Sequence, residues 1–430
     1  MRIGASASPM AGRYVESGSG AETPSQSKAA LAVESPPRHP VAPTTAPVAT
    51  PARSDRRVRD IPSSRGATHL TTPSRLPLDG LPLGAPDACR TTLFAGNVSA
   101  AVTRPSTYTQ TRYLEAKRTV DDRALHRPTL DALGRALDGR AEPIRIVEAG
   151  CGTGSMLRRL LAWDVLSDAV AYHGFDLDPA AVERAATALT AWGEAAGYTV
   201  DEETAGDALE TTAGEAEATT VALTDEDGAT VRATFAVDDV VARARRLDAT
   251  YDLLVGCAVF DLLNLEDALE PLASLVPGGL VYAPITFDGE TFFRSVATDG
   301  DAPVVRRERE RAVIAAYHET MDAPTRPGGS RAGRELLEAV PAAGCRVRAA
   351  GAAGWLVTPP YPGDEAYFLH HLIDGIESAV VDARRAAAGT DRLAREAVRT
   401  WADRRHRAVS TETLAYGAHN LDVLAAVPDA

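Results

Sequence analysis

The sequence predicts an α/β protein built on a doubly wound, Rossmann-like parallel sheet. Three stretches predict it: IRIVEAG (144–150) is an apolar run that ends in glycines, GSMLRRLLAW (154–163) has helical spacing, and AVAYHGFDLD (169–178) is a second apolar run. Pro179 then opens another helical stretch, at a position where its missing N–H has no penalty. Strand, helix, strand and helix in this order are the opening of a parallel doubly wound sheet.

The later strands are expected in chain order. An acidic stretch at 201–218 is interpreted as a solvated insertion ahead of them. A hairpin around an Asp-Gly pair is predicted next, and its second arm supplies the third parallel strand. The stretches that carry these strands are TTVALTDEDGATVRATFAVDD (219–239), YDLLVGCAVF (251–260), LASLVPGGLVYAPITF (272–287) and CRVRAAGAAGWLVTP (345–359).

The two ends of the chain are predicted to lie outside the sheet. Residues 1–90 are rich in Ser, Pro, Thr, Ala and Gly, so we expect a disordered low-complexity tail. Helical spacing with a break at Pro128 predicts an N-terminal helical cap over 91–140. The sheet domain is then expected over 141–360, and helical spacing beyond it predicts a C-terminal helical extension over 361–430.

The composition limits the classes of partner. The formal charge is −14, and only Lys28 and Lys117 are lysines, which weighs against a nucleic-acid partner because that needs a basic surface. The four cysteines form no C-x-x-C pair, which indicates a reducing compartment and no metal site. There is no eighteen-residue apolar run and no signal-peptide core, so we expect a cytoplasmic protein without a membrane partner. The oligomeric state is left open.

The stretch VEAGCGTGSM (147–156) is the strongest indication of a ligand. Gly150, Gly152 and Gly154 follow a strand, which lets the backbone approach a ligand closely, and the next helix points free N–H groups at the same place. A dinucleotide loop would have the pattern G-x-G-x-x-G, but Ser155 follows the third glycine directly. A P-loop is excluded because no Gly-Lys-Ser/Thr follows.

Acids near the ends of the next strands complete the pattern. Asp176 in GFDLD, with Asp178 as the alternative, is placed to accept hydrogen bonds from the ribose of an adenosine ligand. The loop E-x-G-x-G-x-G resembles motif I of class I S-adenosylmethionine-dependent methyltransferases, and LVPGG (275–279) resembles a turn common in these enzymes. The resemblance implies a seven-stranded methyltransferase sheet over 141–360, S-adenosyl-L-methionine as cofactor, and methyl transfer to a small-molecule acceptor.

The resemblance also implies roles for individual residues. Glu148 would lie near the methionine part of the cofactor, and the three glycines would line its amino-acid end and its ribose. The acids of AVDDV, Asp238 and preferably Asp239, would accept from the adenine amino group. Gly256 and Cys257 would present backbone groups to the ligand amino group. Three further pieces resemble an uncharacterised branch of the superfamily: YLEAKRTVDDRAL (113–125), PGDEAYFLHHLIDGIE (362–377) and RRHRAVSTETLAYGAHNLDVL (404–424).

The acceptor site is expected between the N-terminal helices and the segments after strands four and five. His318, whose pKa is naturally near neutrality, and Asp261, which follows strand four, are candidate general bases. Arg331 and Arg334 in the first turn of a helix suggest an anionic acceptor, since helix starts suit anions. The alternative interpretation makes Ser330 an N-cap with both arginines on the surface. TPPY (358–361) looks like an amino-methyltransferase motif, but it falls after the last predicted strand.

Three alternatives to this function remain at the level of sequence. One is an oxidoreductase that uses a nicotinamide cofactor, which Ser155 and the Pro-Gly-Gly turn oppose. Another is a non-catalytic S-adenosylmethionine-binding module. A third keeps the fold and transfers an aminopropyl group, although no Asp-rich polyamine site is evident.

Overall fold

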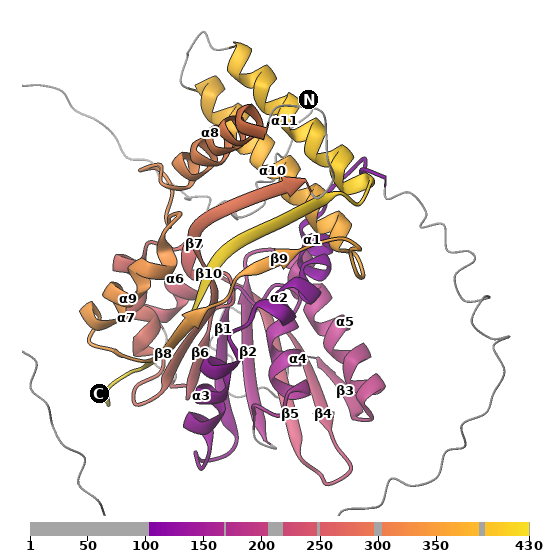
Figure 1. Ribbon diagram of the computed structural model, residues 1–430. Coiled ribbons are helices and arrows are strands. Elements are labelled where there is room, and N and C mark those ends of the chain that lie inside the picture. The colour runs from indigo at the N-terminus through magenta and orange to yellow at the C-terminus, as the bar shows by residue number, and fades with distance from the viewer. Residues whose placement is uncertain are drawn as a thin grey trace, which may run out of the picture. The chain divides into compact units, whose positions relative to one another are not determined.

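One ten-stranded sheet runs through the described part of the computed structural model, which comprises residues 103–166, 169–204, 218–246, 250–295, 303–386 and 392–429 (Figure 1). Its strand order is β3-β4-β5-β2-β1-β6-β7-β10-β8, and β9 pairs with β10. The strands are β1 (Ile144–Ala149), β2 (Val170–Asp176), β3 (Thr199–Thr204), β4 (Thr219–Thr224), β5 (Thr230–Val237), β6 (Leu253–Val255), β7 (Leu280–Ser295), β8 (Arg346–Ala352), β9 (Trp355–Val357) and β10 (Leu414–Ala426).

Seven of these strands have the doubly wound arrangement that the motifs predict. The neighbours β5, β2, β1, β6 and β7 pair in parallel, and β10 runs antiparallel between β7 and β8. The predicted Asp-Gly hairpin is present, because β4 and β5 pair antiparallel across it. The predicted α/β, Rossmann-like, seven-stranded fold class is therefore confirmed.

Helices cover both faces of the sheet, as a doubly wound fold requires. One buried cluster joins Ile144 and Ile146 of β1 to α1–α5, and a second joins Val147 and Ala149 of the same strand to α6, α7 and α9. The helices on the first face are α1 (Gln110–Ala116), α2 (Arg118–Ala124), α3 (Arg127–Leu137), α4 (Ser155–Ala162) and α5 (Pro179–Ala196). Those on the second face are α6 (Val240–Ala244), α7 (Leu265–Ser274) and α9 (Ala332–Ala342).

Local sequence explains where the helices nearest the glycine loop begin and end. Asp178 caps α5 by accepting from Ala180 N at 3.0 Å, Pro179 occupies the first turn, and Gly197 ends the helix with φ +92°. Pro128 is likewise in the first turn of α3, so the break predicted there is a helix start rather than a kink.

A helical cap lies beyond the carboxyl ends of the parallel strands. It consists of α8 (Pro303–Met321), α10 (Glu365–Ala386) and α11 (Arg392–Ser410), and Figure 1 shows it around the far halves of β7 and β10, which run on past the rest of the sheet. Glu310 of α8 fastens the cap to β7, since its carboxylate accepts from Phe293 N at 3.0 Å and from Arg294 Nη1 at 2.6 Å. Arg405 of α11 pairs with the same carboxylate.

Two boundaries differ from those predicted. The C-terminal extension predicted as helical over 361–430 ends in β10, which inserts between β7 and β8 and so belongs to the sheet. Most of β10 is buried, which removes the alternation of polar and apolar residues that marks a half-exposed strand. Residues 201–204 of the predicted insertion extend β3, while 205–217 and the predicted tail 1–90 lie outside the described residues.

Candidate cofactor and acceptor site

The loop between β1 and α4 has a backbone that only glycine adopts easily. Gly150, Gly152 and Gly154 have φ of +61°, +53° and +67°. A side chain at Gly150 would begin 2.5 Å from Val259 Cγ2, so the close packing also requires glycine there. The loop thus leads into the N-terminus of α4 with its main chain uncovered by side chains at three positions, which suits a polar or anionic ligand group.

Asp176 ties this loop to the end of β2. Its Oδ2 accepts from Gly152 N at 2.8 Å and its Oδ1 accepts from Asp178 N at 3.0 Å. Burial raises the pKa of Asp176, and the two N–H groups act in the opposite direction. Each oxygen with one donor keeps a lone pair, so the carboxylate can still accept from a ligand hydroxyl.

The acids after β5 lie beside Asp176, because Asp238 N donates to Asp176 O at 3.1 Å. Their carboxylates are engaged within the chain. Asp238 Oδ2 pairs with Arg243 Nη1 at 3.0 Å, and Asp239 caps α6 by accepting from Val241 N at 2.9 Å. Sequence reasoning placed these acids at the correct strand end. It did not indicate that other residues of the chain engage both carboxylates.

Glu148 is buried, and its carboxylate accepts from Tyr172 Oη at 2.7 Å. Burial raises the pKa of Glu148 to about 8. At the end of β6, Gly256 N donates to Tyr282 O at 3.0 Å, and burial raises the pKa of Cys257 to about 12. The thiol of Cys257 is therefore protonated at neutral pH, and the raised pKa of buried Cys151 has the same consequence.

A buried charge network that sequence reasoning missed lies between α2 and α4. Lys117 Nζ donates to Asp121 Oδ2 at 2.8 Å, and Arg159 approaches the same oxygen at 3.4 Å. Arg159 Nε also donates to Asp122 Oδ1 at 2.6 Å, and Trp355 Nε1 donates to Asp121 Oδ1 at 3.0 Å. The four-residue spacing of Lys117 and Asp121 was readable as a helical ion pair, but nothing in the sequence indicated that it is buried.

Asp261 lies in the short 3-10 helix η1 (Phe260–Leu262) that follows β6. Its side chain is buried, and its Oδ1 has no hydrogen-bond partner within the described ranges. Burial raises its pKa to about 6, against the opposing effects of the backbone N–H groups of Asp261 and Phe287 and of the charge of Lys117. Its charge acts on Tyr113 and Tyr317.

His318, the other candidate base, has different surroundings. It lies in α8 with its ring 5.6 Å from that of Phe287, and its Nε2 lacks a partner in the described part of the chain. Burial lowers its pKa, and the charges acting on it are those of Asp322, Glu290 and Arg331. The charges acting on the two candidates come from different residues, so the structure gives no support for a paired His–Asp base.

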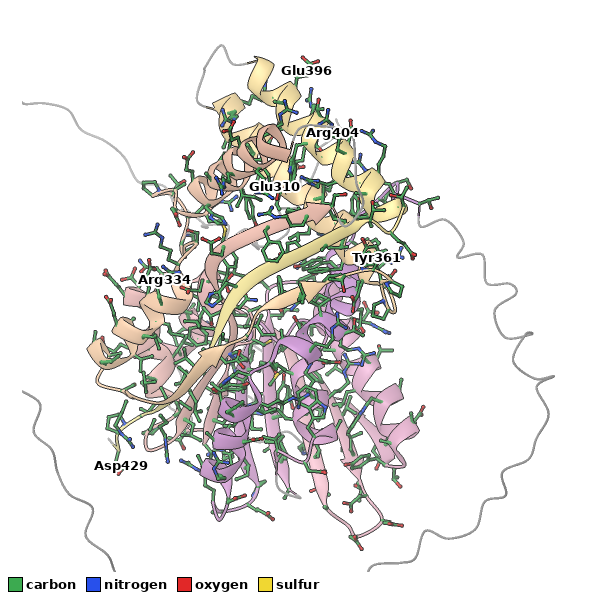
Figure 2. The ribbon with its side chains drawn as sticks, viewed as in Figure 1. Glu310, Arg334, Tyr361, Glu396, Arg404 and Asp429 are labelled. Carbon is green, nitrogen blue, oxygen red and sulfur yellow. The ribbon has the colours of Figure 1, made fainter. Side chains whose placement is uncertain are left out.

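The start of α9 does not offer the open anion site that the arginines suggested. Arg334, labelled in Figure 2, donates to the buried carboxylate of Asp288 through its backbone N at 2.8 Å and its Nε at 2.7 Å. The alternative interpretation is also wrong in one respect. Ser330 is not the N-cap, because its hydroxyl donates to Asp322 Oδ2 at 2.9 Å and α9 begins after Arg331.

The histidine pair of α10 and the TPPY stretch have structural contacts. His370 Nδ1 lies 2.8 Å from His406 Nδ1 in the buried contact between α10 and α11, where burial lowers the pKa of His370 to about 4. Tyr361 of TPPY donates to Leu414 O at 2.7 Å beside the start of β10 (Figure 2). Among the described residues, no helix is long and apolar enough to span a bilayer, and no cluster of three or more His, Cys, Asp or Glu side chains is arranged to hold a metal ion.

No protein-family model matches the chain, and no curated protein matches it. Solved structures with a similar fold include an S-adenosylmethionine-dependent methyltransferase from Thiobacillus denitrificans in complex with S-adenosylhomocysteine (19% identity, 72% of this chain and 97% of that chain, TM-score 0.32). Another is a phosphoethanolamine N-methyltransferase from Haemonchus contortus in complex with S-adenosylmethionine (13%, 76% and 58%, TM-score 0.31).

A third similar structure is the cyclase SpnF (16% identity, 70% of this chain and 82% of that chain, TM-score 0.30). With such low identities and TM-scores, the fold conclusion rests on the strand order itself.

Proposed function

We propose that this chain is an S-adenosylmethionine-dependent methyltransferase that acts on a small-molecule acceptor. The observation that carries the proposal is the contact between Asp176 and Gly152, which fixes a left-handed glycine loop against an acid at the end of the neighbouring strand. This arrangement lies at the carboxyl ends of parallel strands, where ligands bind in open α/β sheets.

The residues around the loop fit the chemical groups of the cofactor. Asp176 keeps lone pairs for the ribose hydroxyls, and the start of α4 suits a carboxylate. Leu177 and Val237, at the ends of β2 and β5, are 42% and 41% exposed and offer apolar surface to a flat ring. Thr153 Oγ1 is buried without a partner in the described residues, so a ligand group would satisfy it.

When bound, S-adenosylmethionine supplies a methyl group on a positively charged sulfur. The chain's part is to orient the acceptor in line with that methyl and to keep water away. The segment at Val259 and the helix α1 are positioned for this, because Val259 packs on Gly150 and Leu114 packs on Gly152. Both lie where an acceptor would have to approach the loop.

Calorimetric titration of the full chain with S-adenosylmethionine, S-adenosylhomocysteine and NAD tests the proposal. We expect the first two to bind, and Asp176→Asn to weaken them about 10- to 100-fold through the loss of charged hydrogen bonds. Thermal unfolding of each variant checks that it is folded. Leu177→Ser changes an exposed side chain and should weaken binding less than Asp176→Asn does. Exposed Asp131→Asn on α3 is the matched control. Binding of NAD alone, or of none of the three, would overturn the proposal.

A further inference from the structure

Three tyrosines and one acid from four separate elements converge near the glycine loop, and we call them the tyrosine–Asp261 cluster. Its members are Tyr113 of α1, Tyr317 of α8, Tyr416 of β10 and Asp261 of η1. All four are buried, between 1% and 6% exposed. Tyr113 and Tyr416 both pack against Phe368, with ring centroids 5.7 and 5.9 Å from its own, and the charge of Asp261 acts on Tyr113 and Tyr317.

The polar ends of this cluster lack side-chain hydrogen-bond partners among the described residues. Asp261 Oδ1 is buried without a hydrogen bond in the described residues. In the same described residues, no hydrogen bond is present at the hydroxyls of Tyr113, Tyr317 and Tyr416. Buried polar groups are normally satisfied, so the unpaired Asp261 Oδ1 indicates a place for a polar ligand.

Two of these tyrosine rings pack against other aromatic side chains. Tyr113 stacks on Phe368 at 5.7 Å, and Tyr416 packs against Phe293 at 5.0 Å. The cluster therefore consists of fixed aromatic side chains whose hydroxyls remain available, which is the rigid first layer that a binding site needs.

The cluster adjoins the proposed cofactor loop. Leu114, next to Tyr113, packs on Gly152, and Val259, two residues before Asp261, packs on Gly150. A molecule held between Tyr113 and Asp261 would lie beside the loop, where a methyl acceptor has to be.

The charges around the cluster decide which acceptor it suits. Lys117, whose charge acts on Asp261, already forms an ion pair with Asp121 at 2.8 Å, and Arg159 is paired with Asp121 and Asp122. Asp261 Oδ1 is thus a carboxylate oxygen to which neither of these cations donates a hydrogen bond. An anionic acceptor would be repelled here, whereas an amine would provide the missing N–H donors and a compensating positive charge.

We propose that the tyrosine–Asp261 cluster binds a small amine as the methyl acceptor, with Asp261 as the residue that holds it and takes its proton. This rests on the proposed function. The ammonium form gives a proton to the Asp261 carboxylate and exposes the nitrogen lone pair. The nitrogen then bonds to the methyl carbon as the carbon–sulfur bond breaks, and the sulfur keeps that electron pair. The proton passes from Asp261 to solvent.

Two matched probe series test this without knowledge of the natural acceptor: methylamine, methanol and formate, and benzylamine, benzyl alcohol and benzoate. Thermal unfolding of the full chain with saturating S-adenosylhomocysteine is measured with each probe at pH 8. We expect an amine to raise the unfolding temperature most. Asp261→Asn should raise the amine concentration needed for that response at least about 10-fold, as loss of a charged hydrogen bond implies. Tyr317→Phe should weaken it less, and Asp131→Asn not at all.

The outcomes separate the two proposals. S-adenosylhomocysteine binding is measured in the same samples, so its absence from the wild type contradicts the proposed function whatever the probes do. Normal S-adenosylhomocysteine binding with an equal response to the alcohols, a stronger response to the carboxylates, or no response to either amine overturns the amine assignment alone. An amine response that survives in Asp261→Asn also overturns it.

Discussion

Buried carboxylates differ in their hydrogen-bond partners between two regions of this molecule. Around the long strands β7 and β10, each buried carboxylate has its donors: Asp422 accepts from Ile285 N at 2.8 Å and His126 N at 2.9 Å, and Asp288 accepts from Arg334 Nε at 2.7 Å. In the tyrosine–Asp261 cluster, Asp261 is equally hidden, yet one oxygen has no partner in the described chain. The first pattern holds the fold together, and the second is expected of a site awaiting a ligand.

The largest effect that separates these regions is expected at Asp422. Asp422→Ala would leave the N–H groups of Ile285 and His126 and the hydroxyl of Tyr282 without an acceptor in the interior. We expect a loss of about 4 kcal/mol in the free energy of unfolding, measured by urea denaturation at pH 7. Asp422→Asn keeps an acceptor oxygen and should lose about half of that. A loss below about 1 kcal/mol in the alanine variant would show that this region is not held by its acid.

The glycine loop should show a smaller effect, through backbone strain. Gly150→Ala places a side chain at φ +61° and against Val259, whereas Gly197→Ala places one at φ +92° with nothing within 4 Å. We expect about 2–3 kcal/mol of destabilisation at Gly150 and about 1 kcal/mol at Gly197. Only Gly150→Ala should also weaken S-adenosylhomocysteine binding by calorimetry. Equal effects of the two substitutions on stability and binding would contradict a special role for the loop.

The same contrast explains what the sequence could predict. The loop, Asp176 and the start of α5 are local features, since glycines after an apolar run, an acid three residues before a proline, and helical spacing all act within a short stretch. They were predicted correctly in position. Asp261 was a candidate because it follows a strand end, although its missing partner is visible only in the fold.

The features that sequence reasoning missed depend on distant parts of the chain. Strand β10 is buried between β7 and β8, so its residues lose the alternation that would have revealed a strand, and Tyr416 was assigned to a helix with it. In sequence, Tyr113 precedes every strand of the sheet, Tyr317 lies between β7 and β8, and Tyr416 lies in the last strand. Asp288 reaches Arg334 across 46 positions, which is why the start of α9 was considered as an open anion site.

The smallest expected effect on the free energy of unfolding is at Asp261. It is the most specific test of the contrast between the two regions, because the substitution is expected to stabilise the protein rather than destabilise it. A buried carboxyl whose pKa is raised from 3.8 to about 6 destabilises the folded state by about 3 kcal/mol at neutral pH. Asp261→Asn removes that charge but buries an amide with unpaired donors, so we expect a net gain of about 1–2 kcal/mol in urea denaturation at pH 7. Asp288→Asn, which weakens a satisfied carboxylate, should lose stability under the same conditions.

The pH dependence of the Asp261 effect identifies its cause. Because the folded pKa lies above the unfolded one, protonation relieves the charge as pH falls, and wild type should approach the variant in stability between pH 7 and pH 4. Lys117, Tyr113 and Tyr317, the groups whose charges interact with Asp261, are present in both proteins, so the difference between the two curves reports the carboxyl alone. A stability difference between wild type and Asp261→Asn that stays constant with pH would mean that burial does not raise the pKa of Asp261. The contrast between a satisfied region and a site awaiting a ligand would then fail.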